Sequence, residues 1–227
     1  MIRLFVDSDL SAQQKIVLPV KQAHYLTHVM RLKSDEEVEI FNGRQGVWRA
    51  LLKQEKKQTT LICQEQIQQQ IALKPCILCP ALIKKEHMDM VLQKATELGA
   101  TEIYPIVAER SVMHTLNMER AQSIICEACE QCERVDVPVL HTPQKLSQIL
   151  DELKEKTHLI WLSERGQTHK THSDLPPALF VGPEGGWTDD EVELLEQHGF
   201  ARYSLGPRIL RTDTAVIALL ARLMDIG

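Results

Sequence analysis

The sequence predicts an α/β protein in which a small β-rich module precedes a larger domain with a mostly parallel sheet. Three observations support this prediction. From residue 75 onward, short apolar runs alternate with amphipathic helical segments, which is typical of a parallel sheet covered on both faces. Before residue 75, β-like runs follow one another around a turn signal. Near the carboxyl end, two glycine-containing turns each connect an apolar run to a helix.

The first 74 residues are expected to hold four strands and one helix. Asn42-Gly43 is a strong turn signal and predicts a hairpin between two of the strands. The polar stretch 66–72 reads as a linker. The expected strands are 2–6, 37–42, 46–54 and 58–66, and the expected helix is 20–31.

The second part alternates strands with helices, and residues 84–98 illustrate the pattern. Met88, Val91, Leu92 and Ala95 recur at helical spacing, and Gly99 is a natural C-terminal cap. The expected strands are 75–82, 102–107, 137–140, 157–162, 178–182 and 201–205, and the expected helices are 84–98, 117–134, 144–155, 188–198 and 213–225.

Length and composition restrict the class of protein. A chain of 227 residues is enough for one large domain, or for a large and a small one. No run of about 18 apolar residues is present, and residues 1–10 lack the apolar core of a secretory signal, so we expect a cytoplasmic protein without a membrane span. Residues 1–74 hold 11 basic and 8 acidic side chains, whereas residues 75–227 hold 15 and 23. This asymmetry favours contact of the small module with a polyanion.

Cysteine and histidine spacing does not favour a metal site. Cys126, Cys129 and Cys132 recur every three residues on an expected helix, and His141 is a conceivable fourth ligand. On a helical wheel Cys132 joins the apolar face while Cys126 points about 120° away, so the three sulfurs converge poorly and ordinary packing is preferred. The pair in 169-HKTH-172 lies in a polar loop and is also not expected to bind metal.

The first glycine turn is 180-FVGPEGGWTDDEVELL-195. Thr188 followed by Glu191 is a capping box, which predicts that a helix starts there. Gly182, Gly185 and Gly186 allow the backbone to bend sharply and to approach a ligand. Their spacing matches neither the dinucleotide fingerprint nor the phosphate-binding loop.

The second turn is 204-SLGPRILRTDTAVIALLARL-223. Thr212 or Asp213 is expected to cap the last helix, and Arg208 and Arg211 crowd its start, although a simple connection needs no arginine. Two such turns at the carboxyl ends of neighbouring strands are where α/β sheets bind small molecules. We therefore expect the two turns to form one ligand site.

Several stretches resemble the RsmE family of ribosomal RNA methyltransferases. They are QKATELGATEIYPI, EACEQCERVDVPV, FVGPEGGWTDDE and SLGPRILRTDTA, and the resemblance extends to RLFV and HVMRLK near the amino end. The paired GPEGG and LGPRILRT blocks, in this order, are highly specific. One position departs from the family pattern, because Asp213 stands where a glutamate is usual, and its carboxylate therefore reaches one methylene less far.

The resemblance implies a fold and an activity. Residues 74–227 would form a SPOUT methyltransferase domain with a C-terminal trefoil knot, and residues 1–70 a PUA-like β-barrel that binds RNA. The protein would be a homodimer that uses S-adenosyl-L-methionine to methylate uridine N3 in 16S ribosomal RNA of the small ribosomal subunit. The alternatives are a SPOUT enzyme that acts on transfer RNA or on a ribose 2′-hydroxyl, and a non-catalytic RNA-binding protein.

Removing the N3 proton places negative charge on the uracil oxygens O2 and O4, which a fixed guanidinium can stabilise. Arg211 is the first candidate for this role and Arg208 the second. Glu184 is a candidate for proton transfer, but a carboxylate near a helix N-terminus tends toward a low pKa and is a poor base. The expected cofactor contacts are Leu162, Gly182, Pro183, Gly186, Leu205, Gly206, Ile209 and Leu210, and the expected RNA contacts are Arg3, Arg31 and Lys33.

Overall fold

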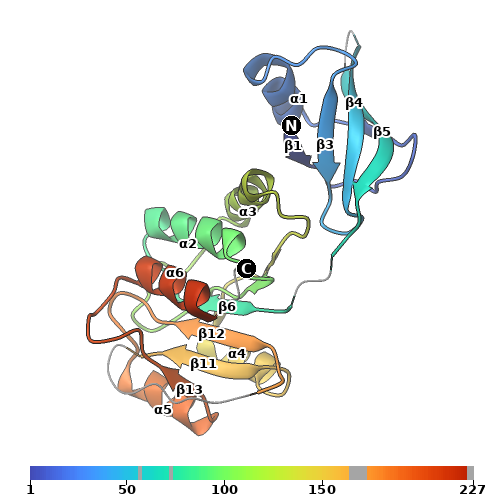
Figure 1. Cartoon of the computed structure of the whole chain (residues 1–227). Coiled ribbons are helices and arrows are strands. Elements are labelled where there is room, and N and C mark those ends of the chain that lie inside the picture. The colour runs from blue at the N-terminus through green and yellow to red at the C-terminus, as the bar shows by residue number, and fades with distance from the viewer. Residues whose placement is uncertain (56–57, 72–73, 164–172, 224–227) are drawn as a thin grey trace. The chain divides into compact units, whose positions relative to one another are not determined.

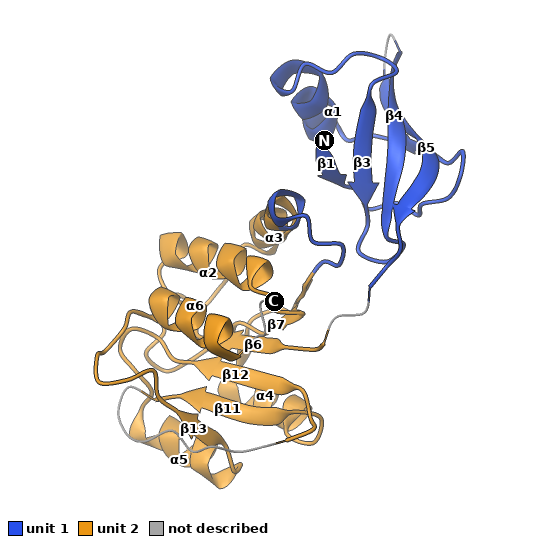
Figure 2. Cartoon of the chain, in the orientation of Figure 1, with its two compact units in different colours: residues 1–72, 129–137 blue, residues 73–128, 138–227 orange. Residues whose placement is uncertain are grey.

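The computed structural model describes residues 1–55, 58–71, 74–163 and 173–223 (Figure 1). The chain divides into two compact units (Figure 2). One consists of residues 1–72 together with residues 129–137, and the other of residues 73–128 and 138–227. The segment 129–137, which includes the last residues of α3 (Met118–Cys132), thus groups with the amino-terminal unit.

A five-stranded sheet in the order β1-β3-β4-β5-β2 forms the first unit. β1 runs parallel to β3, and the other pairs are antiparallel. The expected hairpin is present, with Gly43 at φ +77° in the turn that Asn42 begins. The strands are β1 (Arg3–Phe5), β2 (Lys15–Val17), β3 (Glu37–Phe41), β4 (Val47–Glu55) and β5 (Gln58–Gln68).

The first unit differs from the prediction in three places. β2 was not expected, because only Ile16 of its three residues is buried and the run is too short for a pattern. The expected linker is shorter, because β5 extends to Gln68. The helix expected at 20–31 is a short α-helix, α1 (Val20–His24), continued by a π-helical turn, η1 (Tyr25–Val29), of which only Leu26 is buried.

The second unit is built on a six-stranded sheet in the order β13-β11-β12-β6-β7-β9, in which every pair is parallel. The predicted α/β fold with a parallel sheet is therefore confirmed. Figure 1 shows α2 and α6 on one face of this sheet and α4 and α5 on the other. The helices are α2 (Lys85–Glu97), α3 (Met118–Cys132), α4 (Leu146–Leu153), α5 (Asp189–Gln197) and α6 (Thr212–Leu223), and the sheet strands are β6 (Ile77–Pro80), β7 (Glu102–Ile103), β9 (Val139–Leu140), β11 (His158–Leu162), β12 (Pro177–Val181) and β13 (Ala201–Tyr203).

Alternating side chains of the central strands fill the core. Trp161 and Phe180 pack on one face with Ile149 of α4 and Leu195 of α5. The strand expected at 102–107 is divided at Tyr104-Pro105, because a prolyl nitrogen cannot donate to a ladder. The second piece, β8 (Ile106–Val107), pairs instead with β10 (Gln144–Lys145), which takes the start of the expected helix 144–155.

The cysteine-bearing helix packs differently from the wheel expectation. Cys129, rather than Cys132, is fully buried with Ile125 and Ala128. Among the described residues no cluster of histidine, cysteine and acidic side chains could hold a metal ion, and the 169-HKTH-172 pair lies outside those residues. Within the same residues, every helix is too short or too polar to cross a bilayer. The trefoil knot stays a prediction.

Candidate functional site

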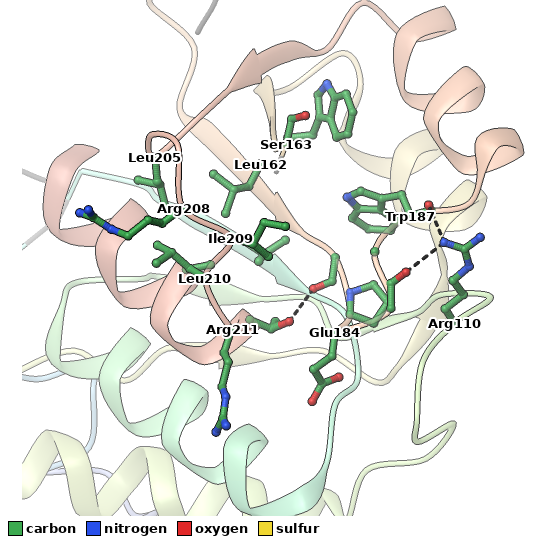
Figure 3. Close-up of a pocket in the computed structure, with 18 of the residues that line it drawn as sticks. Arg110, Leu162, Ser163, Glu184, Trp187, Leu205, Arg208, Ile209, Leu210 and Arg211 are labelled. Carbon is green, nitrogen blue, oxygen red and sulfur yellow. Dashed lines mark hydrogen bonds between the residues drawn. The ribbon is translucent and has the colours of Figure 1, made fainter. Parts of the chain in front are cut away.

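The two glycine turns enclose one cavity of about 470 Å³ at the carboxyl ends of β11, β12 and β13 (Figure 3). Most of its wall comes from three segments, which are the end of β11, the turn between β12 and α5, and the stretch between β13 and α6. Arg110, which follows β8 (Ile106–Val107), adds a fourth. The structure brings together all eleven catalytic and cofactor residues that the sequence singled out. They are Leu162, Gly182, Pro183, Glu184, Gly186, Leu205, Gly206, Arg208, Ile209, Leu210 and Arg211.

The first turn bends in the way its glycines suggest. Gly186 has φ +69°, a conformation that side chains with a Cβ rarely adopt, and its N–H donates to the Pro183 carbonyl at 2.9 Å. A Cβ on Gly182 would lie 3.0 Å from the indole ring of Trp187. The ring of Trp187 therefore packs directly on the backbone of the turn, which only glycine at position 182 accommodates without displacement.

The predicted capping box is present and reaches beyond its own helix. The Glu191 carboxylate accepts a hydrogen bond from the Thr188 N–H at 2.9 Å, and the Thr188 hydroxyl accepts one from the Glu191 N–H at 3.3 Å. Glu191 is buried, and its carboxylate also accepts from the N–H of Glu109, which follows β8, at 3.0 Å. One carboxylate thus fixes the start of α5 and the segment beside it.

Arg110 is a site residue that the sequence analysis missed. Arg110 lines the first cavity, and its guanidinium donates to the carbonyls of Gly185 at 2.9 Å and Trp187 at 3.3 Å, so it holds the first turn in place (Figure 3). Arg110 lies 75 residues before Gly185 in the chain. No local signal points to it, because its place depends on contacts between distant segments, including that of the neighbouring Glu109 N–H with the Glu191 carboxylate.

A hydrogen bond ties the two turns together. The Thr212 hydroxyl donates to the carbonyl of Gly182 at 3.0 Å (Figure 3). The helix α6 begins at Thr212, one residue earlier than expected, so the prediction that Thr212 or Asp213 precedes the helix as its cap is wrong. The Asp213 carboxylate nevertheless accepts from the Thr214 N–H inside the first turn, at 2.7 Å. Nearby, Gly206 has φ +118°, and a Cβ built there would meet open space.

A second cavity of about 350 Å³ shares Glu184, Arg211 and Thr212 with the first. The side chains of Glu184 and Arg211 are exposed, and Figure 3 shows both extending to the same side, away from the apolar group around Ile209 and Leu162. Arg208 is also exposed but extends in a different direction. Ionisable residues form a larger part of the lining of the second cavity than of the first.

His87 and Asp213 face each other in the wall of the second cavity. Their closest atoms, Nδ1 and Oδ2, are 2.8 Å apart. Burial alone would raise the pKa of the Asp213 carboxyl, but hydrogen bonds from His87 and from the Thr214 backbone outweigh burial and lower that pKa. The aspartate is therefore ionised near neutral pH. This pairing joins α2 to α6 across 126 residues and was not predicted.

The three expected RNA contacts differ in their surroundings. The Arg3 side chain is largely buried, pairs with Glu39 at 3.3 Å and donates to the carbonyl of Glu133. Arg31 and Lys33 are exposed, and among the described residues neither side chain makes an ion pair. The positions of Arg31 and Lys33 suit contact with a polyanion, whereas the charge of Arg3 is already neutralised.

Comparison with known proteins agrees with this picture. Residues 69–224 match the sequence model of the RNA methyltransferase domain family, and residues 18–62 match that of the RNA methyltransferase PUA domain. The ribosomal RNA small subunit methyltransferase E of Rickettsia conorii is 30% identical over 99% of this chain and 96% of its own. The protein of the same name from Synechocystis is 33% identical over 97% of this chain and 76% of its own.

Two solved structures are similar throughout. A methyltransferase from Legionella pneumophila, solved with the cofactor SAM bound, has a TM-score of 0.89 and 32% identity over 98% of this chain and 96% of its own. The ribosomal RNA small subunit methyltransferase E of Neisseria gonorrhoeae, bound to S-adenosyl methionine, has a TM-score of 0.87 and 29% identity over the same shares. On the domain matches, the curated relatives and these structures, the chain belongs to the ribosomal RNA small subunit methyltransferase E (RsmE) family of RNA methyltransferases.

Proposed function

We propose that this protein transfers the methyl group of S-adenosyl-L-methionine to N3 of a uridine in 16S ribosomal RNA. The observation that carries the proposal is the junction of two cavities. The first is formed by the glycine turns, and the second is lined mostly by ionisable residues, among them the His87–Asp213 pair. The two share the side chains at which a donor and an acceptor would meet.

The first cavity fits the cofactor. Its volume lies in the range of small-molecule sites, and the open space beside Gly206 would admit a ligand close to the backbone. When bound, the cofactor supplies an activated methyl group on a sulfonium centre. The apolar side chains of Leu162, Ile209 and Leu210 would bind its adenosine, while the backbone of the turn at Gly182 would orient the rest.

Arg211 is proposed to hold the charge that the uracil gains. Losing the N3 proton puts negative charge on O2 and O4, and a guanidinium held at the cavity wall stabilises it without reorganising. The Arg211 side chain lines both cavities and makes no ion pair among the described residues, so it is free to do this. Arg208 lines only the first cavity and is the second candidate.

The two parts of the chain are assigned separate roles. We propose residues 1–70 as an RNA-binding domain, with Arg31 and Lys33 as phosphate contacts, and residues 74–227 as the catalytic domain. Arg3 is left out of the contacts, because its guanidinium is committed within its own unit. The homodimer, the small ribosomal subunit as substrate and a cytoplasmic location are proposed from the family membership.

The test of the function is the identity of the methylated nucleoside. 16S ribosomal RNA from a strain lacking the gene should lack 3-methyluridine, and incubation with the purified protein and cofactor should restore it, as read by mass spectrometry. Arg211→Ala should lower the single-turnover rate on the order of a hundredfold while donor affinity stays within a few-fold. Arg120→Ala is the matched control, because that exposed arginine is paired with Asp89 and lies outside both cavities.

Other outcomes would support the alternatives. Methylation of transfer RNA or of a ribose hydroxyl would replace the proposed substrate. A protein that binds RNA but shows no heat of S-adenosylmethionine binding in calorimetry would be a non-catalytic binder.

A further inference from the structure

The His87–Asp213 pair has a fixed arrangement of protons. An ionised carboxylate can only accept hydrogen bonds, so the 2.8 Å contact requires that Nδ1 of His87 carry the hydrogen. In the neutral ring, Nε2 is then an unprotonated acceptor. No hydrogen bond to Nε2 occurs among the described residues, and the His87 side chain is 30% exposed in the wall of the second cavity.

This arrangement is that of a histidine oriented by a buried carboxylate. The Asp213 side chain is only 10% exposed, and its second oxygen is held by the Thr214 N–H at 2.7 Å, so the carboxylate is fixed from two sides. Such a carboxylate sets the ring tautomer and stabilises the imidazolium that forms when the free nitrogen takes a proton. The same cavity holds Arg211, the group proposed to stabilise the uracil anion.

We propose that His87 is the general base that takes the N3 proton of the target uridine and that Asp213 is the residue that positions it. This inference rests on the proposed function. The N3–H bond breaks and its proton moves to Nε2, and the electron pair left on N3 forms the new bond to the methyl carbon. The carbon–sulfur bond breaks with its pair going to sulfur, and the imidazolium later releases its proton to water. Glu184, the other candidate for proton transfer, lies exposed on the turn, and none of the described residues hydrogen-bonds to its carboxylate.

The charged groups that share the cavity with His87 are Lys84, Glu184, Arg211 and Asp213. Any of them could alter a pH profile, so the test needs a variant that changes only the proton acceptor. His87→Asn is that variant, because its amide can still donate to Asp213 but cannot accept a proton at neutral pH. A purely structural role for the pair, joining α2 to α6, would be preserved by the amide.

His141→Asn is the matched control. His141 also contacts a carboxylate, with Nε2 2.9 Å from Oε2 of Glu102, and its side chain is 25% exposed. It lies in the same unit but lines neither cavity. Asparagine at position 141 places its amide where Nδ1 stood and cannot reach Glu102 as Nε2 does, so this control breaks its pair. If loss of a histidine–carboxylate pair merely loosens the domain, the control should lose activity and His87→Asn should not.

The experiment measures single-turnover formation of 3-methyluridine in 16S ribosomal RNA from about pH 5 to about pH 8, with donor binding followed by calorimetry. In the wild-type protein the rate should rise with pH as a histidine loses its proton. His87→Asn should lose a hundredfold or more of the rate and the rise itself, with donor affinity unchanged. His141→Asn should retain both. A His87→Asn variant with the wild-type rate and profile would overturn the proposal.

A second measurement does not depend on turnover or on a variant that folds. In nitrogen-15 spectra of the histidines of the wild-type protein, His87 should show the tautomer protonated at Nδ1. Finding the hydrogen on Nε2 in the neutral ring would overturn the assignment. If the wild-type protein forms no 3-methyluridine at all, the proposed function fails and the base assignment with it. If the wild-type protein forms 3-methyluridine and the His87→Asn variant is unaffected, only the assignment of His87 as the base fails.

Discussion

Thr212→Val tests whether the hydrogen bond between the two turns organises the cofactor cavity. Valine keeps the shape of the threonine side chain but cannot donate to the Gly182 carbonyl, 3.0 Å away. Thr212 is only 5% exposed, so water does not readily replace the lost donor. We expect the variant to fold, to be less stable and to bind S-adenosylmethionine more weakly.

The magnitude follows from the geometry. A hydrogen bond of this kind contributes about 0.5–1.5 kcal/mol, and an acceptor left unpaired costs about 1–3 kcal/mol, so a loss of about 1–2 kcal/mol is reasonable. For a domain of this size that corresponds to a decrease in Tm of roughly 2–8 °C. If the same energy holds the turns in the arrangement that binds the donor, Kd should rise by about 5-fold to 30-fold.

Thr157→Val provides the comparison. Thr157 is likewise 5% exposed, and its hydroxyl donates to the Leu153 carbonyl at 2.9 Å, at the end of α4 and away from both cavities. Scanning calorimetry should show a loss of stability in both variants, whereas titration calorimetry should show weaker donor binding only in Thr212→Val. Equal donor affinity in the two would mean that the bond stabilises the fold without shaping the cavity.

Three further predictions concern the turn, the RNA and acid stability. Gly182→Ala places a Cβ 3.0 Å from the Trp187 ring, so indole fluorescence should change and donor affinity should fall. An unchanged emission spectrum together with wild-type affinity would contradict this packing. Arg31→Ala with Lys33→Ala should weaken RNA binding and flatten its salt dependence without affecting donor binding, whereas Lys53→Ala, whose lysine is paired with Asp35, should do neither. Because the folded-state pKa of Asp213 lies below its ordinary value of 3.8, its ionised form stabilises the protein above that value, and the contribution disappears as the pH falls through the lowered pKa. Between about pH 5 and about pH 3, the free energy of unfolding should therefore decrease less in Asp213→Asn than in the wild-type protein, as measured by urea titrations. Equal decreases would refute the linkage.

Local signals predicted the turns well. The Thr188–Glu191 capping box is a contact within one helical turn. The positive φ of Gly186 is also a local property, because glycine has no Cβ and adopts this conformation readily. The joining of the two turns was also predictable, because parallel strands end at the same edge of a sheet. The family resemblance then assigned chemistry to the site that these local signals had located.

What could not be predicted depends on contacts between distant segments. The Glu191 carboxylate reaching the Glu109 N–H, and the 126-residue separation of His87 from Asp213, leave no mark on nearby sequence. β2 is too short to show an alternating pattern, and its place is set by pairing with β5. The burial of Cys129 instead of Cys132 was missed because an ideal wheel ignores where the helix ends and which neighbour covers it.

The cavity is built from segments that lie far apart in the sequence, and this affects how the nascent chain can assemble it. The wall between Leu205 and Ala215 is the last of them to leave the ribosome, and the bond from Thr212 to Gly182 cannot form before it does. A nascent chain must therefore assemble β11 and β12 without help from the cofactor, since a ligand stabilises only a fold that already contains its binding site. Cellular cofactor levels should accordingly affect the lifetime of the finished enzyme, but not the yield of its early folding steps.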